Sequence, residues 1–325
     1  MTRFVYMLQT YIPVLFFLKG GLGNQLSQYA YSYEIESLFA RRCVYIYLQS
    51  PSDTMRSELR IRHDRIFFSV PSPLFNFVKI ILVFLKKIQP IASKIFCLIR
   101  DPSDLNQFIP ENPQKIRSSP LFLLFDGYWQ SNTVKDASLD AIASCILRLS
   151  SSKGFKCFET YYGSEPKFCA VHIRRGDLMS SKNISIHSPL SLGYFANAIK
   201  VIQSKLGINN FIVFTDYYDP QSLVSGLTLS SSTAVNVLSF KDDGLSEIDA
   251  FLALSAFSYI AISNSTYSLW ASLLGPKFRK ALNFEDLASC IVQPSEWTKT
   301  NSFYPHIGNC KSNKSVIYIP SLYHA

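Results

Sequence analysis

The sequence of 325 residues lacks several patterns that would place it in a familiar class. Its seven cysteines are odd in number and scattered, and no Cys-x-x-Cys pair is present, which argues against a disulfide framework and a zinc site. We expect most of them to be buried, small apolar side chains in a reducing cytoplasm. Internal repeats and low-complexity tracts are also missing. At roughly 100–200 residues per domain, the length predicts two globular domains.

Acidic residues are fewer than basic ones, and the formal net charge is +9. A basic balance of this size can indicate nucleic-acid binding. However, the basic residues form no long run, and no zinc-finger or RNP-type pattern occurs. We therefore expect no nucleic-acid partner, because an anionic small ligand and an anionic membrane surface account for the charge.

The segment from Phe67 to Arg100 is apolar and basic, and no acidic residue lies between Asp64 and Asp101. Its unbroken apolar core, Ile80–Leu85, is far shorter than the roughly 20 residues that span a bilayer. Such a stretch can lie in the membrane interface near anionic lipid, or form a buried helix whose lysines extend to solvent. The apolar N-terminal stretch is interrupted by polar residues and lacks a signal-peptide cleavage pattern, so we interpret it as core.

A glycine-rich turn follows the first apolar run. Residues 19–25 read Lys-Gly-Gly-Leu-Gly-Asn-Gln, between the strand candidate Pro13–Leu18 and a helix-like stretch over Leu26–Phe39. The next strand candidate is Val44–Leu48. This order predicts a βαβ unit with glycines at the turn, where the backbone can approach a ligand.

The glycine motif is only half of a dinucleotide-binding fingerprint, because Leu26 stands where Gly or Ala is required. The Gly-Lys-Ser/Thr ending of a P-loop is also missing. Asn24 and Gln25 instead place two amide side chains beside Gly21 and Gly23, and amides suit hydroxyl-rich ligands. A helix N-cap is the second interpretation of Asn24.

A second apolar strand candidate ends in two adjacent arginines. Phe168–Val171 reads as a short buried strand, and residues 170–177 read Ala-Val-His-Ile-Arg-Arg-Gly-Asp. Ligands bind at the carboxyl ends of strands in open α/β sheets. Two planar guanidinium groups, those of Arg174 and Arg175, suit a pyrophosphate better than a single carboxylate. A surface salt-bridge pair is the alternative.

Strand and helix candidates alternate in both halves of the chain, which predicts an α/β fold with parallel sheets covered on both faces. We expect an N-terminal domain over residues 1–150, with the basic apolar segment as an insertion at about 67–100. Residues 151–166 are rich in Ser, Gly and Lys and are predicted to be a linker. A second domain with a C-terminal tail is expected over residues 167–325.

Taken together, the motifs resemble the bacterial α-1,2-fucosyltransferases, the glycosyltransferases of family 11. The likeness consists of five segments in the family's order: Gly20–Leu26 with Gln28–Ala30, Gly127–Ser131, His172–Asp177, Phe214–Asp216 and Ser263–Trp270. The third is similar to the His-x-Arg-Arg-Gly-Asp motif shared by α-1,2-, α-1,6- and protein O-fucosyltransferases. The departures, Ser27, Leu178 and Leu269, are at apolar or aromatic positions and put the shape of the acceptor pocket in doubt. The resemblance implies a GT-B-type fold, in which two Rossmann-like domains face a central cleft.

The resembling family transfers fucose from GDP-β-L-fucose to the 2-hydroxyl of a terminal galactose, with inversion. The donor-binding residues that the resemblance implies are His172, Arg174, Arg175, Asp216, Asn264, Ser265 and Thr266. Arg174 and Arg175 would act catalytically by stabilising charge on the leaving phosphates. Asp216 would accept hydrogen bonds from guanine, or else cap a helix. His172 would contact the base, or only pack.

Other residues are expected on the acceptor side and as the proton acceptor. Gly21, Gly23, Asn24 and Gln25 are expected to orient the acceptor or the fucose hydroxyls. A general base must reach the acceptor hydroxyl, and Asp177 is the acid nearest the donor motif. Asp177 could equally orient Arg174 or Arg175 through an ion pair.

No cofactor and no metal is expected, since the Asp-x-Asp tripeptide that holds a divalent ion in many sugar-nucleotide enzymes does not occur. The expected partners are GDP-fucose, a galactose-terminated and lipid-linked oligosaccharide such as an O-antigen or lipopolysaccharide unit, and anionic lipid at the inner face of the cell membrane. Three alternatives remain at this point: an α-1,6-type fucosyltransferase, a non-catalytic nucleotide- or carbohydrate-binding protein, and a membrane-surface scaffold.

Overall fold

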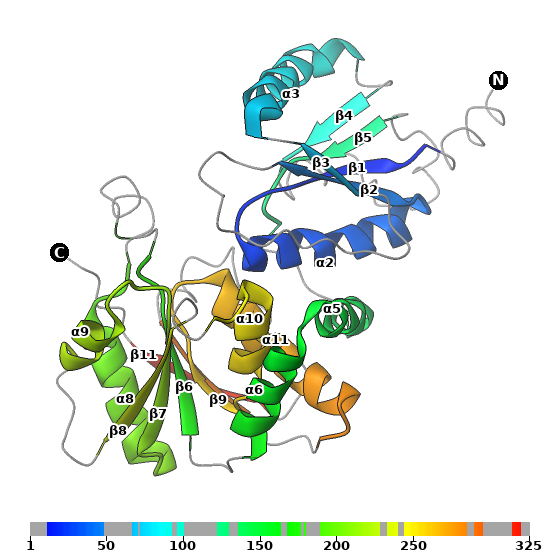
Figure 1. Ribbon diagram of the computed structural model, residues 1–325. Coiled ribbons are helices and arrows are strands. Elements are labelled where there is room, and N and C mark those ends of the chain that lie inside the picture. Colours follow the sequence, from blue (N-terminus) through cyan, green and yellow to red (C-terminus); the bar gives the residue numbers. More distant parts are fainter. Residues whose placement is uncertain are drawn as a thin grey trace. The chain divides into compact units, whose positions relative to one another are not determined.

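The computed structural model describes residues 12–48, 67–70, 72–92, 96–100, 122–129, 136–163, 168–176, 179, 189–227, 233–239, 244–284, 289–294 and 314–319. The chain divides into two compact units, Met1–Ile142 and Ala143–Ala325. Each unit contains one sheet in which the paired strands run parallel (Figure 1). The predicted α/β class with parallel sheets is therefore confirmed. The cleft between two facing domains stays a prediction.

The sheet of the first unit has the order β3-β2-β1-β5-β4. Its strands are β1 (Val14–Leu18), β2 (Cys43–Leu48), β3 (Phe67–Val70), β4 (Phe96–Ile99) and β5 (Phe122–Phe125). The central strand β1 is almost wholly apolar because it is covered on both faces. Phe16 stacks on Phe125 on one face, with ring centroids 4.8 Å apart, and Phe17 packs against Leu82 and Leu98 on the other.

Two helices cover opposite faces of this sheet, α2 (Leu22–Phe39) and α3 (Ser72–Ala92) (Figure 1). Helix α2 begins at Leu22, four residues before the predicted start at Leu26. Gly21 occupies the N-cap, and its carbonyl accepts hydrogen bonds from the amides of Asn24 and Gln25. The alternative that Asn24 caps the helix is thus wrong. Glycine is a poor helix former, but burial of Leu22 and Leu26 in the core outweighs that cost here.

The segment at 67–100 is part of the sheet and not an insertion outside it. It supplies β3, α3 and β4, and β3 pairs with β2 while β4 pairs with β5. The two strands have four residues each, which is too short for a period-2 pattern to stand out beside a longer helix. No helix among the described residues is long and apolar enough to cross a membrane.

The sheet of the second unit has the order β11-β10-β9-β6-β7-β8. Its strands are β6 (Phe168–Ile173), β7 (Asn210–Thr215), β8 (Ala234–Ser239), β9 (Tyr259–Ala261), β10 (Ser289–Pro294) and β11 (Lys314–Ile319). Read from β8, this is the strand order of the doubly wound Rossmann fold. The order reverses between β6 and β9, and at such a switch point loops separate to leave a crevice at the carboxyl edge.

Helices of the second unit pack on both faces of its sheet. They are α6 (Ser152–Gly163), α8 (Leu192–Leu206), α9 (Pro220–Ser225), α10 (Glu247–Ser255) and α11 (Thr266–Ala281), while α5 (Asp136–Leu149) runs across the boundary between the units. On the α8 face, Tyr194 and Ile199 pack against Val171 and Phe211. Cys169 in this core and Cys43, Cys97 and Cys145 elsewhere are buried, as expected.

The predicted linker at 151–166 is wrong, because Ser152–Gly163 forms helix α6. The Ser151 amide and hydroxyl donate to the two carboxylate oxygens of Asp249, at 2.7 and 2.8 Å. A side chain at Gly154 would collide with the same carboxylate. The small and polar residues that suggested a linker therefore allow α6 to dock closely on α10. The units divide at Ile142, earlier than the predicted residue 150.

Candidate functional site

The ends of β6 and β9 meet at the switch point of the second unit. His172 lies near the end of β6, and Ser263 follows β9. The His172 Nδ1 and Ser263 Oγ atoms are 2.9 Å apart and form a buried hydrogen bond. Two motifs that lie about 90 residues apart in the sequence are thus joined at one sheet edge. The structure thus brings together the segments that contain the predicted donor-site residues His172 and Asn264.

His172 is buried and packed. Its ring stacks on Tyr267 of α11, with centroids 5.4 Å apart. Burial, assisted by the nearby Arg174 guanidinium, lowers the pKa of His172 to about 3. The imidazole is therefore neutral at physiological pH, and packing is the role that the contacts support. A contact between His172 and a nucleobase stays a prediction.

Arg175 is a buried cation, with a side chain of which only 4% is exposed. Its Nη1 lies 3.3 Å from Met179 Sδ, and its buried Nη2 has no hydrogen-bond partner in the described part of the chain. Burial lowers the pKa of the Arg175 guanidinium. The surface salt-bridge interpretation fails for Arg175, because a surface pair would keep the guanidinium exposed. Arg174 is half-buried beside it.

Asp216 holds the loop that carries these arginines. Its Oδ1 accepts hydrogen bonds from the backbone amides of Arg175 and Gly176, at 2.8 and 2.9 Å. A side chain at Gly176 would bring a Cβ atom within 2.6 Å of Asp216 Oδ2. The helix-cap alternative for Asp216 is wrong, because Asp219 caps α9 and accepts from the Ser222 amide. Guanine recognition by Asp216 stays a prediction.

Helix α11 begins at the same sheet edge. Ser265 is its N-cap, and its hydroxyl oxygen accepts a hydrogen bond from the Tyr267 amide at 3.3 Å. The Ser265 side chain is buried, while Asn264 and Thr266 on either side are half-buried. The N-terminus of a helix carries partial positive charge and unpaired amides, which favour an anion. A buried guanidinium and a helix N-terminus at one sheet edge can together hold a diphosphate.

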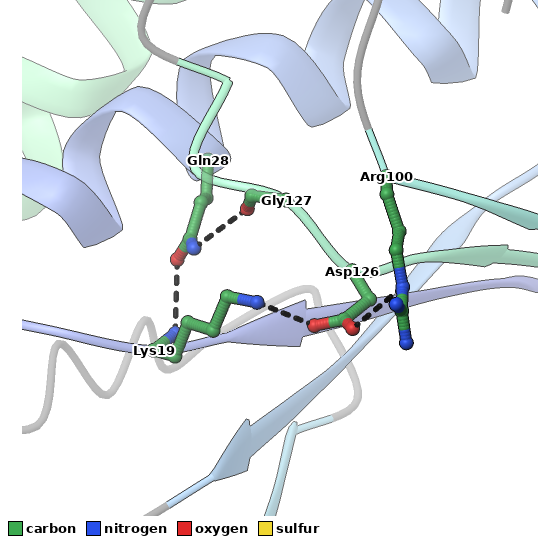
Figure 2. Close-up of polar contacts among 5 residues, drawn as sticks. All are labelled: Lys19, Gln28, Arg100, Asp126 and Gly127. Atoms are coloured by element: carbon green, nitrogen blue, oxygen red, sulfur yellow. Dashed lines mark hydrogen bonds and ion pairs between the residues drawn. The ribbon is translucent and has the colours of Figure 1, made fainter. Parts of the chain in front are cut away.

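The first unit has a second polar network, where β1, β4 and β5 end (Figure 2). The Asp126 carboxylate lies 2.6 Å from Lys19 Nζ and 3.5 Å from Arg100 Nε. The Lys19 amide donates to Gln28 Oε1 at 3.0 Å, and Gln28 Nε2 donates to the Gly127 carbonyl at 2.8 Å. Gln28 therefore ties helix α2 to the ends of β1 and β5, the pair at which this sheet reverses its order.

The four residues expected on the acceptor side lie at the start of α2. Gln25 is buried, and its Nε2 donates to the Gly20 carbonyl at 2.9 Å, so its amide supports the glycine turn. Gly23 is buried within the helix, and Asn24 is half-buried with Nδ2 directed to Gly20. A Cβ added at Gly21 would meet no atom within 4 Å. Sugar binding by these residues stays a prediction.

Sequence reasoning missed the network around Asp126. Asp126 and Arg100 each directly follow a short apolar strand, and Gln28 lies two helical turns after Gly21, which were the available signals. Trp129 was also missed: it is buried against Tyr31, has a φ of 53°, and its Nε1 has no partner among the described residues. The candidate base Asp177 lies outside the described residues.

No group of three or more His, Cys, Asp or Glu side chains that could hold a metal ion occurs within the described ranges. The charged groups at the two sheet edges are instead arginines, a lysine and single carboxylates. What these can offer a ligand is hydrogen-bond donors and fixed positive charge.

Comparison with known proteins agrees with the motifs. The sequence model of Glycosyl transferase family 11 matches residues 109–283, more than half of the chain. The chain is 27% identical over 313 residues to the O-antigen biosynthesis glycosyltransferase WbnK of Escherichia coli, a match that covers 88% of this chain and 95% of that protein. It is 24% identical over 303 residues to an alpha-1,2-colitosyltransferase of Escherichia coli, covering 89% and 94% of the two chains.

Solved structures of similar outline include a mutant of Arabidopsis thaliana FUT1 in complex with GDP, at a TM-score of 0.47 and 13% identity, covering 84% of this chain and 72% of that one. Another is the fucosyltransferase NodZ from Bradyrhizobium, at 0.44 and 12%, covering 82% and 94%. Likenesses at these TM-scores carry no weight for the site, and the family assignment rests on the sequence.

Proposed function

Because the chain belongs to glycosyl transferase family 11, we propose that it transfers L-fucose from GDP-β-L-fucose to the 2-hydroxyl of a terminal galactose. The observation that carries this proposal is the buried Arg175 guanidinium, with one nitrogen unpartnered among the described residues, at the sheet edge where α11 begins. Burying a cation is costly unless hydrogen-bond partners compensate for the lost water. A bound diphosphate would supply the missing acceptor oxygens.

The donor diphosphate would lie between the β6 loop and the start of α11. Arg174 and Arg175 would bind the β-phosphate, and the Ser265 and Thr266 hydroxyls would complete the cradle with nearby amides. When the bond between the sugar C1 and the β-phosphate oxygen breaks, negative charge grows on the leaving GDP. Cations fixed before the reaction stabilise that charge without reorganising.

Inversion follows if the acceptor oxygen attacks C1 from the face opposite the phosphate. The new C–O bond forms as the old one breaks, and the proton of the acceptor hydroxyl passes to a base. Asp177 is our candidate for that base, with orientation of Arg174 or Arg175 as its other possible role. Asp216 would bind guanine through Oδ2, since its Oδ1 already accepts two backbone amides.

The acceptor is proposed to be a galactose-terminated surface oligosaccharide, as in an O-antigen or lipopolysaccharide unit. The name of the WbnK relative, an O-antigen biosynthesis enzyme, supports this class. Gly21, Gly23 and Asn24 would approach the acceptor or the fucose hydroxyls, while Gln25 would act through the turn that it holds. We propose a cytoplasmic enzyme that needs no metal, because the two arginines would supply the positive charge.

A second donor deserves a direct test, because one relative is named as an alpha-1,2-colitosyltransferase. Colitose is fucose without its 3-hydroxyl group, so the two donors share the GDP moiety and differ in a single sugar hydroxyl. The α-1,2 linkage in that name supports the same linkage here.

The test is to incubate the full-length protein with a panel of β-galactosides and, in turn, GDP-L-fucose, GDP-colitose and GDP-mannose, with EDTA present. Nuclear magnetic resonance of the product identifies the sugar, the linkage and the anomeric configuration. We expect an α-1,2-fucosyl product that EDTA does not abolish. An α-1,6 product would contradict the proposed linkage, and transfer of colitose alone would contradict the proposed donor. Absence of transfer from every GDP-sugar despite GDP binding would support a non-catalytic binding protein.

A further inference from the structure

Helix α3 carries an exposed apolar surface, which we call the outer face of α3. Its members are Phe77, Ile80, Val83, Phe84 and Ile91, whose exposed fractions are 61%, 66%, 50%, 58% and 91%. The residues Phe77, Ile80, Phe84 and Ile91 follow one another at intervals of three, four and seven, and therefore form one stripe along the helix. Water-exposed apolar groups gathered in one patch usually mark an interaction site.

The opposite face of α3 packs in the core of the first unit. Leu82 is buried, and Val78, Leu85 and Ile88 pack beside it on the sheet with Phe17 and Leu98. The Gln89 side chain accepts a hydrogen bond from the Leu98 amide at 2.9 Å, which fixes the helix on β4. The helix is therefore anchored through its inner face, and its outer apolar residues lie outside this core cluster. The interpretation of a buried helix whose lysines extend to solvent holds for the inner face and the lysines of α3, but it does not account for the exposed apolar residues.

The charged side chains on α3 and in the sequence on either side of it, between Asp64 and Asp101, have one sign. Lys79, Lys86 and Lys87 are exposed on the helix. No acidic residue occurs anywhere between Asp64 and Asp101. Lysines beside exposed aromatic and aliphatic side chains can extend their ammonium groups away while the apolar groups enter a nonpolar layer.

We propose that the outer face of α3 docks on the surface of an anionic lipid bilayer, with the helix lying in the interface. An anionic bilayer offers both an apolar layer within about 5–10 Å of its surface and negative charge at the headgroups. A second copy of the chain would bring lysine against lysine. A protein partner is disfavoured because the cores of protein interfaces are depleted in lysine.

This inference does not rest on the proposed function, since it concerns a different unit and a different chemistry. Its test is sedimentation of the full-length protein with vesicles of phosphatidylcholine alone and with 30 mol% phosphatidylglycerol (a content of roughly one anionic lipid in three, chosen to give a strong surface potential). We expect binding to the anionic vesicles only, and weakening as salt is added. Transfer and GDP binding are measured on the same samples without vesicles.

Two variants separate the charge from the apolar contact. The double variant Lys86→Gln/Lys87→Gln should weaken binding on the order of thirtyfold. Its matched control, Lys200→Gln/Lys205→Gln, removes the same charge from exposed positions of α8 and should weaken it far less. The variant Phe77→Gln/Phe84→Gln should abolish binding, whereas Tyr218→Gln/Leu206→Gln, at exposed positions of the second unit, should not. Circular dichroism verifies that each variant folds.

Equal binding to neutral and anionic vesicles would overturn the proposal, and so would binding that survives the Phe77→Gln/Phe84→Gln change. If the wild type does not bind vesicles but forms a concentration-dependent dimer, and the Phe77→Gln/Phe84→Gln variant stays monomeric, a second copy of the chain covers the face. That result would also overturn the proposal. If the Phe77→Gln/Phe84→Gln variant loses vesicle binding but keeps its affinity for GDP, the result supports the proposal. It also shows that membrane binding can be tested independently of the proposed function.

Discussion

Arg175 carries its charge at a buried position, where an ion is costly to keep. Its guanidinium is buried at the end of β6, and its Nη2 lacks a hydrogen-bond partner among the described residues. Taking an ion out of water costs several kcal/mol unless partners repay that cost. Buried charges of this kind gather at functional sites, where a ligand completes the arrangement. The same residue is therefore expected to affect stability and ligand binding in opposite directions.

We predict that Arg175→Met raises the free energy of unfolding of the ligand-free protein by about 1–2 kcal/mol, because it removes the desolvated charge and keeps an unbranched side chain. The same change should weaken GDP binding at least tenfold. Urea unfolding and isothermal titration calorimetry measure the two effects. Arg148→Met, at an exposed position of α5, is the control and should change neither. Lower stability together with unchanged GDP affinity would mean that Arg175 has a purely structural role.

His172 should make stability depend on pH on the acid side. Its pKa is about 3 in the folded state against about 6.5 in the unfolded chain, so between these values the unfolded state binds more protons. Stability should thus fall as pH decreases from about 6.5 toward 3, by at most about 1.4 kcal/mol for each pH unit, and should be independent of this group above 6.5. Urea unfolding of the wild type and of His172→Gln at several pH values measures the difference in slope.

In this comparison the His172→Gln profile should be flatter than that of the wild type. Ser263→Ala is the matched variant, because it removes the hydrogen bond to Nδ1 and leaves the histidine in place. It should keep the acid slope. Parallel profiles for the wild type and His172→Gln would show that His172 is not held neutral.

At the scale of elements, Gln28 links one helix to two strand ends. Its Oε1 accepts a hydrogen bond from the Lys19 backbone amide, and its Nε2 donates one to the Gly127 carbonyl (Figure 2). Gln28 is completely buried, so a replacement that cannot hydrogen-bond would leave both backbone groups without their partner. Each unsatisfied buried group costs about 1–3 kcal/mol. The Gln28 side chain therefore holds the glycine turn against the segment after β5, alongside the ion pair between Lys19 and Asp126.

We predict that Gln28→Leu, which keeps most of the side-chain volume, destabilises the protein by roughly 2–4 kcal/mol. Thermal and urea unfolding provide the measurement. Gln221→Leu, at an exposed position of α9, is the control and should fall within about 0.5 kcal/mol of the wild type. If Gln28→Leu is as stable as the control, water replaces the lost hydrogen bonds and Gln28 does not fix the turn.

Elements with a clear apolar pattern could be predicted from the sequence, and elements defined by tertiary contacts could not. The runs that form β1, β2 and β6 are apolar almost throughout and lie within a residue or two of their predicted bounds. Helix α6 contains Gly154 and many polar residues. It forms because the Asp249 carboxylate accepts hydrogen bonds from Ser151, at the start of the helix. Helix α2 begins inside a glycine motif because Leu22 is needed in the core.

At the scale of the whole molecule, the topology of the parallel sheet explains which motifs meet, while the roles expected for their residues stay predictions. The meeting of His172 with Ser263 follows from two strand ends in neighbouring positions of a parallel sheet. The engagement of Asp216 by the amides of Arg175 and Gly176 could not be foreseen, because it depends on the path of a loop. The Asp126 network, which gathers three strand ends, was missed because two of those strands have only four residues and are weak signals in the sequence.

The division into two units predicts that a donor nucleotide affects one of them locally. The β6 and β9 ends, with the proposed diphosphate site, belong entirely to the second unit. The α3 helix belongs to the first. Binding of GDP should therefore leave amide exchange in α3 unchanged, while ligand linkage stabilises the second unit against unfolding.

Hydrogen–deuterium exchange of the full-length protein with and without saturating GDP tests the central claim most directly. The account predicts slower exchange in peptides that contain residues 172–176 and 263–268, and unchanged exchange in peptides from α3. Protection confined to the first unit, or none at a GDP concentration that calorimetry shows to be saturating, would contradict a donor site at the β6–β9 switch point.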